Sequence, residues 1–162
     1  MVIWIIGKSG SGKTYLAKFL KKKIRYKNIK WIDRDKFRLK YSRDLGYSKE
    51  DREKNSERIS KLCKKYENKN YLVICSILSI FRTHQKKNRD LYKKYFQIYI
   101  KCDSKKLALR NNKKIYSKKK YVVGKDISFP EPFKSDFIIT NTFKPIFLIK
   151  AEKIIKKINE KI

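Results

Sequence analysis

The residues from Gly7 to Thr14 have the types and spacing that most clearly predict chemistry in this chain. They read Gly-Lys-Ser-Gly-Ser-Gly-Lys-Thr, which fits the pattern of a phosphate-binding loop, Gly-x-x-x-x-Gly-Lys-Ser/Thr. In such a loop the backbone N–H groups surround the phosphates, the lysine contacts the β- and γ-phosphates, and the hydroxyl holds Mg²⁺. We therefore expect ATP as a substrate and Mg²⁺ as its cofactor. The expected ATP-binding residues are Gly7, Ser9, Gly10, Ser11, Gly12, Lys13 and Thr14, with Thr14 as the metal ligand.

The segments on either side of the loop support this interpretation. Val2 to Ile6 is a continuous apolar run, typical of a buried parallel strand. Residues 14–24 carry apolar side chains at helical spacing. A helix that starts there directs the positive end of its dipole toward bound phosphates. The alternative, a tight turn that binds no nucleotide, does not require this order of strand, loop and helix.

Two carboxylates, Asp33 and Asp35, follow a short apolar segment at 29–32 that predicts a second strand. Beyond a strand end, one of them can accept a proton from an attacking hydroxyl or organise Mg²⁺. An isolated Asp-x-Asp pair is more often a helix cap, so both interpretations stay open. Farther along, Arg52 and Asn55 lie three residues apart on a predicted helix and can bind a phosphate or a sugar. Alone, such a pair is more often part of a solvated surface.

The remaining hydrophobic pattern predicts strands that alternate with helices. Strands are expected at 2–6, 29–32, 71–75, 96–100 and 137–140, and helices at 14–24, 35–40, 49–66, 82–94, 104–110 and 146–162. Ser48, with Asp51 three residues later, is a favourable start for the helix at 49–66. This order predicts an α/β P-loop kinase fold in one domain, 1–162. Its parallel five-stranded sheet has helices on both faces and binds ligands at the carboxyl ends of the strands.

Residues 111–132 are polar and rich in lysine, and they include two of the three prolines, Pro130 and Pro132. A long segment of this composition predicts a loop rather than a packed element. Kinases commonly close such a segment over the reacting phosphates to exclude water. We expect a mobile lid loop at about 110–132.

The chain has 45 lysines and arginines against 15 acidic residues, a formal net charge of +30. This charge fits an anionic partner such as a nucleotide, a nucleic acid or a membrane surface. It also fits a general bias toward lysine, which we favour because the lysines are spread along the chain. A basic nucleic-acid-binding module is the alternative from another functional class. We expect no nucleic-acid partner, since no RNP-like strand motif or helix-turn-helix pattern accompanies the charge.

The first 20 residues hold a short apolar segment followed by Gly-Ser-Gly, which is neither a signal peptide nor a membrane span. Cys63, Cys75 and Cys102 have no CxxC spacing and are expected to be reduced thiols. The sole histidine, His84, cannot complete a zinc site with such scattered cysteines. These features predict a cytoplasmic enzyme with no membrane partner.

Residues 33–82 resemble the adenylylsulfate kinase (APS kinase) family, which phosphorylates the 3′-hydroxyl of adenosine 5′-phosphosulfate (APS). The family pattern DGDNVRxGLNRDLGFSxxDRxENxRR aligns without a gap with DRDKFRLKYSRDLGYSKEDREKNSER, and ITSFISPYR aligns with ICSILSIFR. The family's lid pattern RDPKGLY is similar to the segment that begins at Arg110, and TGIDDPYEAPxxPD matches Gly124, Asp126, Pro132 and Asp136. The resemblance covers nearly the whole chain. It implies an ATP-dependent kinase, commonly a homodimer, that acts on a small nucleotide.

The resemblance implies a role for each matching position. Acceptor contacts fall on Asp35, Arg38, Tyr47, Arg52, Asn55, Leu78 and Ser79. From the lid, Lys113 would close over the reacting phosphates and touch the acceptor, and Arg110 would face ATP. The implied catalytic residues are Lys13, Asp33, Asp35 and Lys113. Either Asp33 or Asp35 would be the general base or an organiser of Mg²⁺.

The base-binding pocket departs from the family at two positions. The family holds adenine between two phenylalanines, which align here with Ile77 and Val122. Stacking on an aromatic ring contributes about 1–3 kcal/mol per base in single-strand binders, so this loss weakens adenine binding unless Tyr121 supplies a ring. Arg34 and Lys36 also replace a glycine and an asparagine of the family pattern. These departures imply an acceptor with a smaller, pyrimidine base.

One branch of the family phosphorylates the 3′-hydroxyl of cytidine 5′-diphosphoramidate in capsular polysaccharide biosynthesis, and we expect this acceptor. The alternative is a true APS kinase in which Tyr121 compensates for the missing rings. A kinase-like scaffold without turnover is disfavoured, because Lys13, Thr14, Asp33 and Asp35 are all present.

Overall fold

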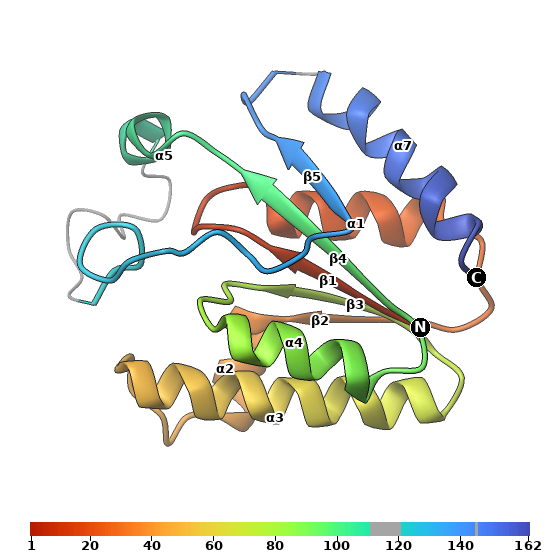
Figure 1. Cartoon of the computed structure of the whole chain (residues 1–162), viewed down its shortest axis with the longest axis horizontal. Helices are drawn as coiled ribbons and strands as arrows, with labels where there is room; N and C mark the ends of the chain where they lie inside the picture. The colour runs from red at the N-terminus through yellow and green to blue at the C-terminus, as the bar shows by residue number, and fades with distance from the viewer. Residues whose placement is uncertain (111–120, 145) are drawn as a thin grey trace.

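The computed structural model describes residues 1–110, 121–144 and 146–162 (Figure 1). Within them, parallel strands form one sheet in the order β2-β3-β1-β4-β5. The strands are β1 (Val2–Ile6), β2 (Ile29–Asp33), β3 (Leu72–Ile77), β4 (Tyr95–Lys101) and β5 (Phe137–Thr140). Because all of these strands run in one direction, their carboxyl ends meet at one edge of the sheet. The predicted parallel five-stranded sheet is confirmed.

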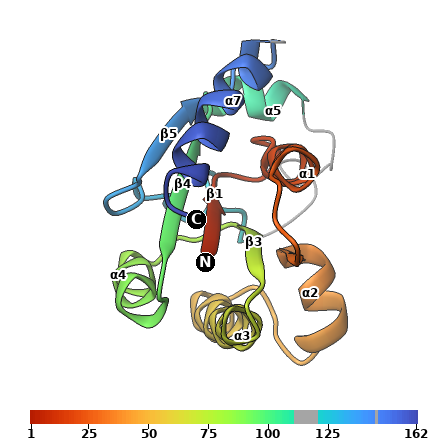
Figure 2. The ribbon, with the colours of Figure 1, turned by 90° about the vertical axis from the view of Figure 1, so that its right-hand side faces the viewer.

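Helices cover both faces of the sheet (Figure 2). α1 (Lys13–Lys23) and α7 (Ile146–Asn159) lie on one face, whereas α3 (Lys49–Asn68) and α4 (Arg82–Leu91) lie on the other. α2 (Arg34–Tyr41) packs beside α3, and α5 (Ser104–Arg110) follows the carboxyl end of β4. The α/β arrangement predicted from the alternating pattern is therefore confirmed.

The two cores explain why β1 is an unbroken apolar run. Successive side chains of a strand point to opposite faces of the sheet. Ile3 and Ile5 pack in the core with α1 and α7, whereas Trp4 packs in the core with α3. Every residue of β1 is buried. A strand covered on both faces has no solvent side, so apolar and polar residues do not alternate along it.

The element ends follow from local capping. Ser48 Oγ accepts a hydrogen bond from the Asp51 N–H at 3.1 Å, as predicted for the start of α3. Asp33 caps α2, since its Oδ1 accepts bonds from the N–H groups of Asp35 and Lys36 at 3.0 and 3.3 Å. The helix predicted at 82–94 ends earlier, at Leu91, because the chain becomes extended at Tyr92 and turns into β4.

Part of the predicted lid, 111–120 with Lys113, lies outside the described residues. The described part forms a turn around Gly124, whose N–H donates to the Ile127 carbonyl at 2.8 Å. Val122 and Val123 are buried, and Val123 packs with Ile80 and Phe81. This end of the predicted lid is therefore anchored by apolar packing.

Cys63, Cys75 and Cys102 are free thiols, as predicted. Cys63 and Cys75 are buried, and desolvation raises the pKa of the Cys75 thiol well above its usual value, which keeps it protonated and unreactive. Among the described residues, no helix is both long enough and apolar enough to cross a membrane.

Candidate active site

The phosphate-binding loop joins β1 to α1 at the carboxyl edge of the sheet. Gly12 has a φ of +98°, and a β-carbon there would come within 2.8 Å of Asn141 Nδ2, so glycine alone fits without strain. Gly10 also has a positive φ, of +79°. Lys13 Nζ donates to the Lys8 carbonyl at 2.7 Å. This bond holds the ammonium across the loop that is predicted to surround the phosphates.

Asp33 connects this loop to the end of β2. Its Oδ2 accepts hydrogen bonds from Thr14 Oγ1 at 3.2 Å and from Ser76 Oγ at 3.1 Å. Trp31 Nε1 in turn donates to Ser76 Oγ at 3.2 Å. Asp33 is thus a helix cap through one oxygen and a neighbour of the predicted Mg²⁺ ligand through the other. The helix-cap interpretation of the Asp-x-Asp pair therefore applies to Asp33. The catalytic interpretation stays a prediction, with which the hydrogen bond from Thr14 is compatible.

The donors present fit Mg²⁺, which prefers oxygen ligands and usually keeps several waters and substrate phosphates around it. Thr14 and Asp33 supply one hydroxyl and one carboxylate at the mouth of the loop. The described residues hold no group of three or more acidic, histidine or cysteine side chains that could bind a metal by themselves. This arrangement fits an ion that arrives with ATP.

Two cavities meet at this edge of the sheet. One, of about 330 Å³, lies over the phosphate-binding loop and is lined by Ser9, Gly10, Gly12, Lys13, Thr14 and Asp33, among others. The other, of about 540 Å³, contains these predicted acceptor residues: Asp35, Arg38, Tyr47, Arg52, Leu78, Tyr121 and Val122. Ser9, Arg34, Asp35 and Leu78 line both cavities. These four residues therefore lie where the two cavities meet.

Arginines make the larger cavity strongly positive. Arg38 donates to the Leu45 carbonyl at 2.7 Å, and Arg52 donates to the carbonyls of Tyr47 and Tyr121 at 3.0 and 2.8 Å. Both guanidinium groups contact the Tyr47 ring, whose centroid lies 4.6 Å from the guanidinium of Arg38 and 5.6 Å from that of Arg52. Burial, reinforced by the charges of Arg34 and Arg38, lowers the pKa of Arg52 to about 10. Cations crowded in this way form a site for an anion.

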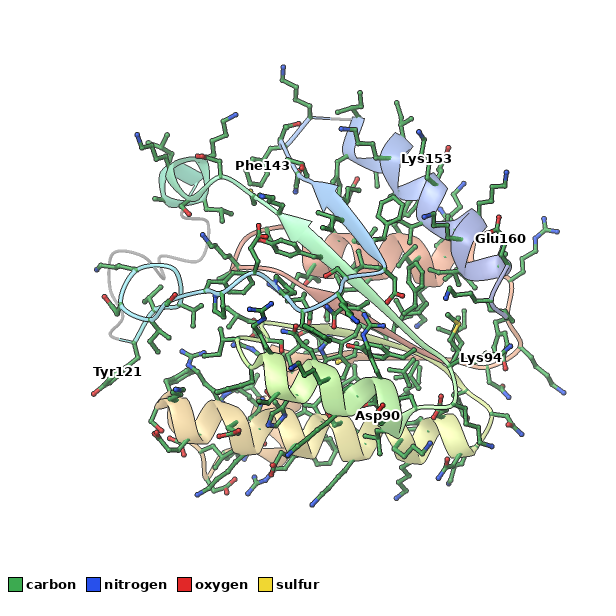
Figure 3. The ribbon with its side chains drawn as sticks, in the orientation of Figure 1. Asp90, Lys94, Tyr121, Phe143, Lys153 and Glu160 are labelled. Carbon is green, nitrogen blue, oxygen red and sulfur yellow. The ribbon has the colours of Figure 1, made fainter. Side chains whose placement is uncertain are left out.

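Tyr121 and Val122 bring the described end of the lid to this cavity. The Arg52 bond to the Tyr121 carbonyl joins α3 to this segment. Figure 3 shows Tyr121 at the outer end of the segment, with its side chain directed away from the sheet. The side chain is 59% exposed, so its ring is available to a ligand. Val122 is buried in the cavity wall.

Three predicted acceptor residues do not line either cavity. Ile77 is fully buried in the core between β3 and α3. Ser79 is also buried, and it accepts a hydrogen bond from Gln85 Nε2 at 3.3 Å. Asn55 is buried on α3, and its Oδ1 has no hydrogen-bond partner among the described residues.

Two predicted ATP-binding residues, Gly7 and Ser11, belong to the inner side of the loop, where Ser11 is buried. Of Arg110, only the backbone at the end of α5 is described.

Asn141 is a site residue that the sequence interpretation missed. Its Nδ2 donates to the Ser11 carbonyl at 3.0 Å, and its Oδ1 accepts from the Phe143 N–H at 2.8 Å. The side chain is buried, so these bonds fix the loop to the carboxyl end of β5. The available signal was a polar residue directly after the predicted fifth strand.

Comparison with known proteins identifies the family of this chain. The family model described as adenylylsulphate kinase matches residues 1–140. The chain belongs to the adenylylsulfate kinase family. It is therefore an ATP-binding P-loop nucleotide kinase, a phosphotransferase that acts on a nucleotide hydroxyl group. This confirms the family expected from the resemblance.

Among its relatives, the cytidine diphosphoramidate kinase of Campylobacter jejuni is 34% identical over 164 residues, covering 97% of this chain and 95% of that protein. A probable adenylyl-sulfate kinase of Bacillus subtilis is 33% identical over 147 residues, covering 85% and 74%. The fold is shared with the Mycobacterium tuberculosis APS kinase solved with AMPPNP and APS, at a TM-score of 0.84 and 24% identity over 98% of this chain and 96% of that one.

Proposed function

We propose that this kinase transfers the γ-phosphoryl group of ATP–Mg²⁺ to the 3′-hydroxyl of cytidine 5′-diphosphoramidate, in the biosynthesis of phosphoramidate-bearing capsular polysaccharide. One observation carries the proposal: Asp35 lines both the cavity over the phosphate-binding loop and the arginine-rich cavity beside it. An acceptor hydroxyl in the larger cavity can then meet the γ-phosphate with a carboxylate next to both.

The two aspartates divide the chemistry between them. Asp33 already accepts bonds from two N–H groups and two hydroxyls, so it suits the role of organising Mg²⁺ with Thr14. The Asp35 side chain is 51% exposed and suits the general base. The acceptor oxygen attacks the γ-phosphorus in line, the bond to the β–γ bridging oxygen breaks, and ADP leaves. The hydroxyl proton passes to the Asp35 carboxylate, while Lys13 contacts the phosphates that gain charge.

The arginine cluster suits the 5′ end of the acceptor. A diphosphoramidate is an anion, and guanidinium groups bind such groups by charge-assisted hydrogen bonds. Arg38 and Arg52 both contact the Tyr47 ring, and all three residues line the larger cavity. Burial, together with the charges of Arg34 and Arg38, lowers the pKa of Arg52, and a bound anion would offset both effects.

The remaining wall favours a small base. Leu39, Leu45, Leu78, Val122 and Val123 give the larger cavity aliphatic sides. The relative in Campylobacter jejuni that is named for a cytidine substrate matches almost the whole length of this chain. These two observations support cytidine rather than adenine as the base.

A second acceptor, APS, is supported by the tyrosines of the same cavity. The side chains of Tyr47 and Tyr121 are 46% and 59% exposed and line the larger cavity. Either ring can stack on a purine. Many relatives are named adenylyl-sulfate kinases, among them proteins of Bacillus subtilis and Thermodesulfovibrio yellowstonii.

The test measures ATP consumption with each acceptor separately, cytidine 5′-diphosphoramidate and APS, at matched concentrations. We expect kcat/KM to be at least tenfold higher with the cytidine compound. The Lys13→Ala variant, which loses the phosphate contact, serves as the control and should show no turnover while keeping its circular dichroism spectrum. A higher kcat/KM with APS would refute cytidine 5′-diphosphoramidate as the acceptor and support APS. ATP hydrolysis that neither acceptor stimulates would refute both acceptors.

We also propose a cytoplasmic location, because the reaction consumes ATP. By analogy with APS kinases, we propose that the protein is a homodimer. Size-exclusion chromatography with light scattering tests the homodimer, for which we expect a mass of about twice the chain mass of 19.6 kDa.

A further inference from the structure

Arg34 lies where the two cavities meet. It is the first residue of α2, and the Asp33 cap on this helix fixes its backbone beside the phosphate-binding loop. Its side chain lines both cavities, whereas Arg38 and Arg52 line only the larger one. The side chain is 20% exposed. Arg34 is therefore the arginine placed nearest to the path of the transferred group.

The guanidinium of Arg34 is held by the proposed general base. Its Nε and one terminal nitrogen donate to Asp35 Oδ1 at 3.0 and 2.7 Å. When Asp35 accepts the hydroxyl proton, its carboxylate loses the negative charge that holds Arg34. At the same stage, negative charge accumulates on the oxygens of the phosphoryl group and on the leaving ADP. The attraction on the guanidinium thus shifts from the carboxylate toward the phosphates.

We propose that Arg34 is a catalytic residue, which turns from Asp35 to the transferring phosphoryl group and stabilises its charge in the transition state. This inference rests on the proposed function, in which transfer takes place between the two cavities. The arginine acts from within the same chain, and it contributes only after an acceptor engages Asp35. The ion pair with Asp35 in the free enzyme then restrains ATP hydrolysis when no acceptor is bound.

The first test compares Arg34→Ala, Arg34→Lys and the control Lys40→Ala. Lys40 is on the same helix and exposed, and it lines neither cavity. Loss of one group that stabilises the charge of the transition state commonly lowers kcat by about 100- to 1000-fold. We expect a loss of that size for Arg34→Ala, partial recovery for Arg34→Lys, and KM values for ATP and acceptor within about threefold of wild type. The kcat of Lys40→Ala should stay within about twofold of wild type.

A binding measurement separates this role from acceptor positioning. ADP, Mg²⁺ and aluminium fluoride imitate the transferring phosphoryl group, whereas AMPPNP imitates bound ATP. With acceptor present, we expect Arg34→Ala to bind ADP–aluminium fluoride at least tenfold more weakly than wild type, with AMPPNP binding unchanged.

Two results would overturn the proposal: an unchanged kcat in Arg34→Ala, or an effect confined to the acceptor KM. Both variants and wild type are measured with whichever acceptor the wild type phosphorylates. A preference of the wild-type enzyme for APS would therefore refute the proposed acceptor and still leave the role of Arg34 decided by its own result.

Discussion

The Asp33 side chain has an observed role in the fold and a proposed role in the chemistry. One of its oxygens caps α2 and the other accepts a hydrogen bond from Thr14. Asparagine also caps helices well, so Asp33→Asn removes the charge that is proposed to organise Mg²⁺ and keeps the cap. We predict that kcat falls at least 100-fold and that the free energy of unfolding changes by less than about 1 kcal/mol. Steady-state kinetics and urea denaturation measure the two quantities.

The matched comparison is Asp33→Ala, which removes the charge and the cap together and should also lower stability by about 1 kcal/mol. Near-normal activity in Asp33→Asn would mean that this carboxylate does not organise the metal ion.

Arg52 provides a prediction about anions. Its pKa of about 10 reflects burial near other guanidinium groups, which disfavours its charge in the folded state. A bound anion offsets this penalty. We predict that 10 mM sulfate raises the Tm by about 2–4 °C over chloride at equal ionic strength, and that Arg52→Gln removes most of the rise. Differential scanning fluorimetry measures the Tm. The experiment uses a Lys13→Ala background, because this substitution reduces sulfate binding at the phosphate-binding loop.

The pH dependence follows from the same shift. Because the folded-state pKa lies below the ordinary value, the unfolded chain keeps this proton to higher pH than the folded one. Below about pH 9 Arg52 is charged in both the folded and the unfolded chain. The loss of stability from its buried charge, and the rise in Tm caused by sulfate, should therefore be the same at pH 6.5 and 8.5. The sulfate effect should decline only as the pH rises through about 10. A decline between pH 6.5 and 8.5 would point to a different group.

At the scale of elements, the structure connects β5 to the phosphate-binding loop through Asn141. The buried amide holds the Ser11 carbonyl and the turn that leads to α7. We predict that Asn141→Ala raises the KM for ATP about tenfold, because the loop loses a support for its phosphate-binding shape. Since each lost hydrogen bond contributes about 1 kcal/mol, the free energy of unfolding should fall by about 1–2 kcal/mol.

The neighbouring exposed residue offers the control for this element. Thr142→Ala changes the same connection without touching the loop, so its KM should match wild type. An Asn141→Ala enzyme with an unaltered KM for ATP would show that β5 does not support the nucleotide site.

Most elements could be predicted because their signals are local. The apolar run of β1, the glycines of the loop and the Ser48 cap can each be recognised from a few consecutive residues. The boundary of α4 was misplaced because the position of β4, a long-range feature, decides where that helix ends. Asn141 was missed for a similar reason, since its partner Ser11 lies 130 residues away in sequence.

The acceptor site shows the same limit at finer detail. Alignment places Ile77 in the base pocket, but its side chain packs in the core, while Leu78 lines both cavities. Leu78 follows directly after β3, so which of these two neighbours reaches a ligand depends on where the strand ends. The roles assigned to the site residues stay predictions, including those of Asn55, Ile77, Ser79, Arg110 and Lys113.

At the scale of the whole molecule, the charge of +30 concerns association rather than fold. A field of this sign attracts any polyanion, and non-specific nucleic-acid binding weakens steeply with salt. We predict that the KM for the acceptor rises several-fold between 50 and 300 mM salt, while kcat stays within about twofold. Double-stranded DNA should compete at low salt and leave kcat unchanged. Tight DNA binding above 200 mM salt without ATP would instead favour the nucleic-acid-binding module.

The most direct test of the account is to locate the transferred phosphate in a mixture of ATP, APS and cytidine 5′-diphosphoramidate at equal concentrations. Phosphorus–proton correlation NMR identifies the product through the sugar proton coupled to the new phosphomonoester. We predict a signal coupled to H3′ of the cytidine ribose, because the cavity beside Asp35 has aliphatic and arginine-rich walls, which we propose to bind a small base and an anionic 5′ group. A signal coupled to the adenosine ribose would show that the pocket selects a purine, and inorganic phosphate alone would show that the enzyme is not a kinase for either nucleotide.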